Sequence, residues 1–227
     1  MKKLIWFIFL ALVALGTDAQ SPVSFQVKAG VGMANFYGKD TEDAEAKFAY
    51  KVGVGMDYAF NRTWSLQTFL NFVSKGSKGE AEDWAKMTMN ELYLELPVMA
   101  ALRVPVSEKT QLVLSAGPYI ACGIGGKTTA DIEERKIPTT TGYETIGGKY
   151  EADTFGALKD GNIGMNRFDA GLAFGVAAEC HRFILGIDAQ LGLTDISGDL
   201  KKVAEAMSVE MGSTKNISAF FSIGYRF

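Results

Sequence analysis

The sequence predicts an all-β protein, an eight-stranded antiparallel up-and-down transmembrane β-barrel. Three observations support this fold class. Eight segments alternate large apolar residues with small or polar ones at a period of two, which is the period of a strand. The connections between these segments are alternately short and long, and charged side chains occur in only one of the two registers. A barrel with one polar and one apolar face accounts for all three.

The chain begins with MKKLIWFIFLALVALGTDAQ, in which two lysines precede an apolar run and then small residues. This order is typical of a secretory signal peptide, and the run is too short to span a bilayer as a helix. We expect cleavage between Ala19 and Gln20, so that residues 1–19 are the signal peptide and residues 20–227 the barrel domain. The exported barrel is expected in the outer membrane of a Gram-negative cell.

The first four predicted strands are residues 24–34, 48–60, 63–72 and 91–104. In FAYKVGVGMDYAF every even position is large and apolar, and Lys51 and Asp57 occupy the other register. Thr68 is the one hydroxyl in the apolar register of the third strand. Pro97, in the fourth, is unfavourable because proline cannot donate to a ladder, but it leaves the register intact.

The other four predicted strands are residues 111–124, 167–178, 182–193 and 216–227. Pro118 is again unfavourable, for the same reason. Short connections are expected at residues 61–62, 105–109 and 179–181, and long ones at 35–47, 75–86, 125–166 and 195–215. This is the layout of outer-membrane barrels, which have short periplasmic turns and longer outside loops. Within the last loop, LKKVAEAMSVEM favours a short helix.

A soluble lipocalin-like barrel would have the same period with its apolar register inside. The charged register favours the membrane barrel, because its positive and negative side chains nearly balance, and an unpaired charge enclosed in a lumen is costly. Eight strands also leave an interior just wide enough for side chains, so we expect a plugged lumen. The predicted luminal polar network comprises Lys28, Lys51, Asp57, Glu91, Glu95, Arg103, Arg167, Asp169, Arg182, Asp188 and Arg226.

Aromatic residues of the apolar register gather near the short connections, as in the interfacial girdle of a membrane barrel. The predicted lipid-facing girdle comprises Phe25, Tyr58, Phe60, Trp64, Phe183, Tyr225 and Phe227. Outer-membrane lipid is therefore an expected partner. Nucleic acid is not, because basic residues do not cluster with interleaved aromatics.

Residue chemistry points away from an enzyme, and we expect no catalytic, cofactor-binding or metal site. The only histidine, His181, is in a predicted short turn beside Cys180, and no acid is evident to orient it. Cys122 and Cys180 are expected at opposite ends of the barrel as free thiols. Glu91 and Glu95 are roughly 13 Å apart along a strand, too far to act on one bond. We expect them to pair with luminal arginines, Arg103, Arg167 or Arg226.

The segments NELYLELPVMAALRV, SAGPYIACGIGG, RFDAGLAFGVAAEC, DAQLGLTDIS and the final IGYRF resemble the PorT-like outer-membrane β-barrel family. This family is part of the wider set of small OmpA/OmpX-type barrels. The terminal aromatic Phe227 resembles the signal that the barrel-assembly machinery reads in a C-terminal strand. The family's named member assists secretion of other proteins across the outer membrane, so the resemblance implies that role as one option.

We therefore expect a non-enzymatic integral outer-membrane β-barrel protein with a plugged polar lumen. It would have a structural or interaction role at the cell surface, with a possible protein partner at its extracellular loops. Deleting residues 126–163 should leave the barrel folded and abolish that binding. Two alternatives stay open: a narrow porin or small-solute channel, and an accessory factor for protein secretion. A hydrolase would have His181 as its only candidate.

Overall fold

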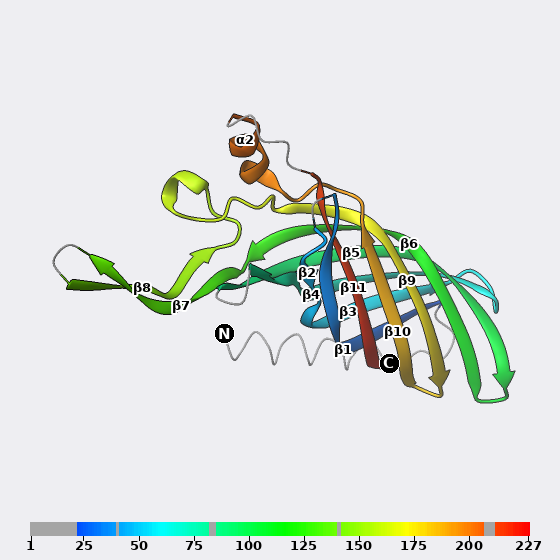
Figure 1. Ribbon diagram of the computed structural model, residues 1–227. Coiled ribbons are helices and arrows are strands. Elements are labelled where there is room, and N and C mark those ends of the chain that lie inside the picture. The colour runs from blue at the N-terminus through cyan, green and yellow to red at the C-terminus, as the bar shows by residue number, and fades with distance from the viewer. Residues whose placement is uncertain (1–21, 40, 82–84, 140–141, 207–211) are drawn as a thin grey trace, which may run out of the picture.

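The computed structural model describes residues 22–39, 41–81, 85–139, 142–206 and 212–227, and the predicted signal peptide lies outside these ranges. Figure 1 shows the arrangement of the elements. They are β1 (Val23–Gly38), β2 (Ala44–Glu45), β3 (Lys47–Ala59), β4 (Trp64–Ala81), β5 (Ala85–Ser107), β6 (Thr110–Gly125), β7 (Lys127–Thr139), β8 (Gly142–Asp153), the 3₁₀ helix η1 (Leu158–Asp160), β9 (Phe168–Cys180), β10 (Phe183–Gly192), α2 (Gly198–Ala206) and β11 (Thr214–Arg226).

Eight antiparallel strands close into a ring in the order β1, β3, β4, β5, β6, β9, β10 and β11. The ring closes because β4 pairs with β5 and β11 pairs back with β1. Each of the other pairings joins ring strands that follow one another along the chain, which confirms the predicted up-and-down barrel. Outside the ring, β2 pairs with β4, β7 with β5, and β8 with β7.

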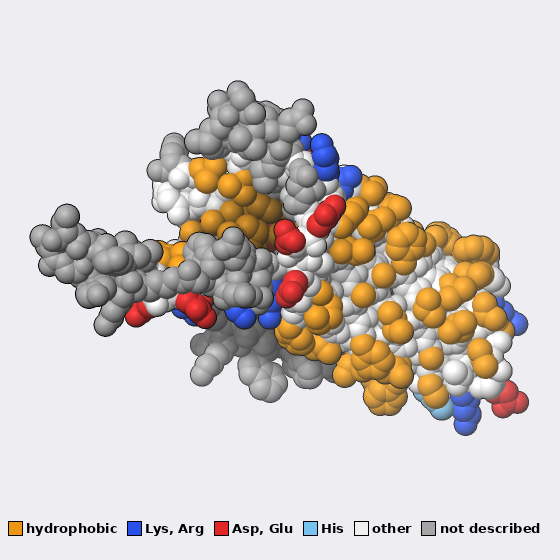
Figure 2. All heavy atoms as spheres, viewed as in Figure 1, with side chains coloured by type: hydrophobic (Ala, Val, Ile, Leu, Met, Phe, Trp, Pro, Cys, Tyr) orange, Lys and Arg blue, Asp and Glu red, His pale blue; other side chains and the backbone are white. Residues whose placement is uncertain are grey.

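The apolar register of the strands faces outward. On β3, Phe48 is 59% exposed and Val52 53%, whereas Lys51 and Asp57 are buried. Figure 2 shows the same on the visible face, where hydrophobic side chains cover the barrel wall and charged ones gather toward its ends. The chain therefore has a polar interior and an apolar exterior, the reverse of a soluble barrel. None of the described helices is long and apolar enough to cross a bilayer.

The ring has two unlike ends. We call the end with the tight turns after β3, β5 and β9 the short-turn end, and the opposite one the long-loop end. At the long-loop end the prediction of a long connection at residues 75–86 is wrong, because β4 continues to Ala81 and pairs with β5 from Ala85 onward. The extension carries polar residues in both registers, so no apolar alternation marks it as a strand.

The longest predicted loop also contains regular structure. Within residues 125–166, β7 and β8 form a hairpin that projects away from the ring, and η1 follows it (Figure 1). Helix α2 overlaps the helix predicted in the last loop and begins two residues before it. Residues 207–211, the end of that predicted helix, lie outside the described residues.

Pro97 and Thr68 lie together where the β4–β5 ladder is interrupted. The β4–β5 ladder pairs Thr68 with Val98 and resumes at Asn71 and Glu95, so it skips the proline. The Thr68 hydroxyl donates to the Pro97 carbonyl at 3.0 Å. The one hydroxyl in an otherwise apolar register therefore satisfies a backbone group at the point where the ladder is interrupted.

Candidate functional site: the lumen and its cap

Charged side chains of both signs point into the barrel in equal number. On the inward register of the described ring strands, the buried or half-buried cations are Lys28, Lys47, Lys51, Lys75, Arg103 and Arg226, and the carboxylates are Asp57, Glu91, Glu95, Asp169, Glu179 and Asp188. Because an enclosed charge is stable only with partners, their pairing determines what the lumen can do. Ten of these twelve form three clusters along the barrel, and Lys47 and Glu91 lie outside them.

The first cluster lies at the short-turn end. Arg103 of β5 is hydrogen-bonded to Asp57 of β3, and its Nη1 donates to Glu179 of β9 at 2.7 Å. Arg226 of β11 lies 2.6 Å from the same Glu179 carboxylate. The Gln67 amide also donates to Asp57, at 2.6 Å. Two arginines and two carboxylates from four strands thus cross-link the barrel from inside.

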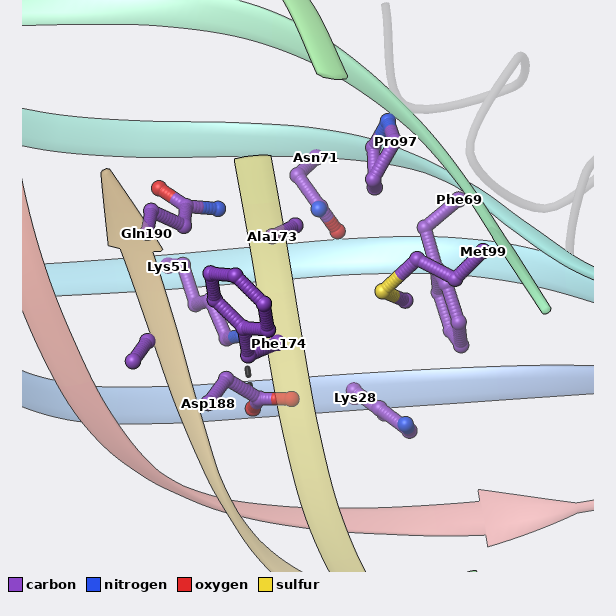
Figure 3. Close-up of a pocket in the computed structure, with 11 residues that line it drawn as sticks. Lys28, Lys51, Phe69, Asn71, Pro97, Met99, Ala173, Phe174, Asp188 and Gln190 are labelled. Carbon is purple, nitrogen blue, oxygen red and sulfur yellow. Dashed lines mark ion pairs between the residues drawn. The ribbon is translucent and has the colours of Figure 1, made fainter. Parts of the chain in front are cut away.

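The second cluster is at mid-height and appears in Figure 3, where a dashed line joins Lys51 and Asp188. The Lys51 ammonium is 2.7 Å from Asp188, which also accepts a hydrogen bond from Ser222 at 2.6 Å. The Lys28 ammonium lies 4.6 Å from the centre of the Phe69 ring, a cation–π distance. The cavity between these side chains is about 20 Å³, which holds about one water molecule.

The third cluster is centred on Lys75 of β4, whose side chain is wholly buried. Its ammonium is 3.0 Å from Glu95 and 3.4 Å from Asp169, and it lies 4.3 Å from the centre of the Tyr119 ring. Asp169 also accepts hydrogen bonds from the hydroxyls of Tyr119 and Thr194, both at 3.0 Å. Lys75 is therefore held by two anions and an aromatic face, in a fixed position.

Glu91 lies just above this cluster, and its surroundings differ. The residue is fully buried, yet neither carboxylate oxygen has a hydrogen-bond partner among the described residues. The expectation that Glu91 and Glu95 pair with Arg103, Arg167 or Arg226 is wrong. Glu95 pairs with Lys75, while Arg103 and Arg226 bind Asp57 and Glu179.

The long-loop end of the lumen is covered by a group of apolar side chains that we call the cap cluster: Phe155, Met165 and Ile196, all buried. The Phe155 ring packs edge-on against Tyr93 with centroids 5.4 Å apart. It fills the space above Gly123, where an added Cβ would lie 2.6 Å from the ring. The segment after β8 supplies Phe155 and Met165, and the segment after β10 supplies Ile196. Both segments thus fold back over the long-loop opening of the lumen.

Two of the predicted network residues lie outside the lumen. Arg167 is exposed at the long-loop end, where its Nη1 donates to the Gly123 carbonyl at 2.8 Å. Arg182 is exposed in the turn after β9, with its Nη1 3.4 Å from the Tyr225 hydroxyl. Both occupy the polar register but stand at strand ends, where the wall no longer encloses the side chain.

Sequence reasoning also missed three inward charges, Lys47, Lys75 and Glu179, because it placed them in connections. The signal was present for Lys75, which continues the inward register of Gln67 and Asn71. Glu179 likewise continues the inward register of Asp169 to the end of β9.

The geometry described above agrees with one family. A model of the outer membrane protein beta-barrel domain matches residues 18–198. The chain belongs to this outer-membrane β-barrel family. No curated protein matches the sequence.

Solved outer-membrane barrels have a similar arrangement at low identity. Ail, the attachment invasion locus protein of Yersinia pestis, is 13% identical with a TM-score of 0.41, over 90% of this chain and 98% of Ail. Neisserial surface protein A is 12% identical with a TM-score of 0.42, over 90% and 97%. OprG from Pseudomonas aeruginosa is 11% identical with a TM-score of 0.40, over 92% and 99%.

The predicted girdle residues of this outer-membrane barrel lie on its outer surface toward the short-turn end. Phe60 and Phe183 are 62% and 69% exposed, and Phe25, Tyr225 and Phe227 are half-buried. Tyr225 packs edge-on between Phe183 and Phe227, with ring centroids 5.5 and 5.3 Å away.

Asp195 anchors the last outside loop of the barrel. Its carboxylate accepts hydrogen bonds from the Ser197 hydroxyl at 2.6 Å and from the backbone N–H groups of Ser197 and Thr214, both at 3.1 Å. Lys201 of α2 forms an ion pair with it at 2.9 Å. Desolvation alone would raise the pKa of Asp195, but these donors outweigh it and lower the pKa to about 2.

The remaining reactive side chains are dispersed. Cys122 and Cys180 are free and exposed, near opposite ends of the β6–β9 ladder, as predicted. The Cys180 sulfur is 3.6 Å from His181 Nδ1, and both residues are exposed at the short-turn end. In the described part of the chain, His, Cys, Asp and Glu side chains form no group of three or more that could hold a metal.

Proposed function

We propose that this outer-membrane barrel is a non-enzymatic protein whose lumen is closed to solutes and whose activity resides at the long-loop end. The observation that supports the closed lumen is the set of three ion-pair clusters between Asp57 and Asp169, with a mid-height cavity of only about 20 Å³. A solute could pass only by separating buried pairs, and breaking one costs about 3–5 kcal/mol.

Planar-bilayer recording tests the closed lumen against the alternative of a narrow porin. The purified barrel should insert and give no steady conductance. A stable open level in the wild-type protein would contradict the proposal and support a small-solute channel.

The proposed interaction surface is the long-loop end, where the β7–β8 hairpin and α2 project beyond the ring (Figure 1). Strand β7 pairs with β5 from Thr128 to Ile132, and Ile132 is opposite Gly148 on β8, so residues 133–147 can be replaced by a short glycine linker without loss of the β5–β7 ladder. A larger deletion of residues 126–163 would also remove Thr154 and Phe155, which are buried at the lumen's opening.

The tagged wild-type chain should capture a protein partner from intact outer membranes. The hairpin-deletion variant should fold as a barrel but no longer capture that partner. Heat-dependent electrophoretic mobility reports whether the barrel is folded. If the deletion variant is folded and still captures the same protein, the partner does not bind through this hairpin.

A role as accessory factor for protein secretion rests on the PorT-like resemblance of residues 90–104 and 167–180. In that proposal the signal peptide at residues 1–19 exports the chain, and the barrel-assembly machinery inserts it through the β11 strand that ends at Phe227. Comparing secreted proteins with and without the chain tests the role, and an unchanged secretome contradicts it.

A further inference from the structure

A second cavity lies at the long-loop end, outside the lumen clusters. Its volume is about 350 Å³, within the range of about 300–1,000 Å³ found for small-molecule sites. It lies between the outer end of β1, the extended β4–β5 hairpin, and the segment that contains Ser197 and α2. Its apolar lining consists of Phe36, Ala44, Met87, Met89, Met165 and Leu200.

The strand register explains why this space is empty. Met87 and Met89 continue the inward register of Glu91 and Tyr93 beyond the point where the ring is closed. Opposite Met87 on β4 is Gly79, which has no side chain to fill the space. A Cβ added at Gly79 would meet only the Asp43 carbonyl oxygen, at 3.8 Å.

Three of the hydroxyl groups around the cavity are already engaged with the protein. The Ser77 hydroxyl bonds to Asn35 Oδ1 at 2.7 Å, the Thr41 hydroxyl donates to the Gly38 carbonyl at 3.1 Å, and the Ser197 hydroxyl donates to Asp195. The exposed charges at the rim, Asp43 and Lys78, are of opposite sign. The walls therefore do not favour a charged ligand.

We propose that this cavity binds a small uncharged aromatic molecule. Three methionine thioethers and the Phe36 ring surround the space. Thioether sulfur makes favourable contacts with aromatic rings, and the flexible methionine side chain adapts to ligands of different outline. The site does not depend on whether the barrel conducts or on which protein binds the hairpin.

Indole serves as the probe, added to the full barrel in lipid nanodiscs with ¹³C-labelled methionine methyl groups. The methyl signals of Met87, Met89 and Met165 should shift and saturate with indole concentration. Met33 and Met56 lie exposed on the outer wall and report indole dissolved in lipid. Their shifts should rise without saturation. Equal, unsaturated shifts at all five methyl groups would overturn the proposal.

A pocket-filling variant provides the second arm. Gly79→Leu should weaken indole binding by about tenfold or more, because its side chain occupies the cavity. Gly125→Leu is the matched control, since Gly125 also lies at the long-loop end of a ring strand and a Cβ there meets nothing within 4 Å. The proposal fails if folded Gly79→Leu binds indole as the wild type does, or if both variants weaken it equally.

Discussion

At the scale of single residues, the luminal charges are held by groups on several strands at once. Arg103 joins β3, β5 and β9 through Asp57 and Glu179. Lys75 joins β4, β5 and β9 through Glu95 and Asp169. Such side chains cross-link the strands from inside the barrel, beside buried apolar residues such as Phe69 and Met99.

Replacing Arg103 by alanine should lower the free energy of unfolding by about 3 kcal/mol or more, because two buried carboxylates lose a cation. Urea unfolding in lipid vesicles measures this. Lys127→Ala is the control: it breaks an exposed pair with Glu151, 65% and 50% exposed, and should change stability by less than about 1 kcal/mol. Equal effects would show that the Arg103 pairs add no more than a surface contact.

Thr68→Val should cost about 1 kcal/mol although it changes the side-chain shape little, because the Pro97 carbonyl loses its donor. The same unfolding assay applies. Thr68→Ser keeps the hydroxyl and should lose less stability than the valine variant. If serine is the more destabilising substitution, methyl packing rather than the hydrogen bond determines the choice of threonine.

The residue register was predictable, but the pairing was not. Alternation alone identified Lys51, Asp57, Glu95 and Asp188 as inward-facing, and the structure places them so. Which charges meet across the lumen depends on the stagger between strands. The alternation of apolar and polar residues shows which face a side chain is on, but it does not reveal that stagger. That is why Glu95 was expected beside an arginine and pairs instead with Lys75.

At the scale of elements, the strands inside the membrane were predictable and their extensions were not. A strand crossing lipid needs an apolar register, and all eight ring strands show it. Once β4 and β5 leave the lipid, their outward face no longer needs apolar side chains, and the alternation is lost. Secondary structure in the outer hairpins is therefore fixed by backbone pairing, such as Ala81 with Ala85, more than by side-chain hydrophobicity.

Asp195 should tie the last outside loop to β11 in a pH-dependent way. Its folded pKa of about 2 lies below the ordinary value of about 3.9. Its stabilising contribution is therefore complete above about pH 4 and is lost as the pH falls through about 2. The amide signals of Ser197 and Thr214 should titrate with that midpoint. Asp195→Asn should abolish the titration, and a midpoint near 4 would contradict the anchoring role.

At the scale of the whole molecule, the outer wall predicts how the barrel lies in lipid. Trp64 is 48% exposed on the outer wall near the short-turn end. In a Trp84→Phe background, lipids brominated near the headgroup should quench Trp64 more than lipids brominated near the bilayer centre. Leu70→Trp places a tryptophan at mid-wall. In the same Trp84→Phe background, with Trp64→Phe added, this tryptophan should show the reverse order. The same order for both tryptophans would contradict the predicted girdle.

The height of the wall is uneven around the ring. Strand β5 has 23 residues and β10 has 10, which at about 3.3 Å per residue gives contours of about 75 and 33 Å. The rim of the barrel at the long-loop end is therefore oblique: it is high at β5 and low at β10.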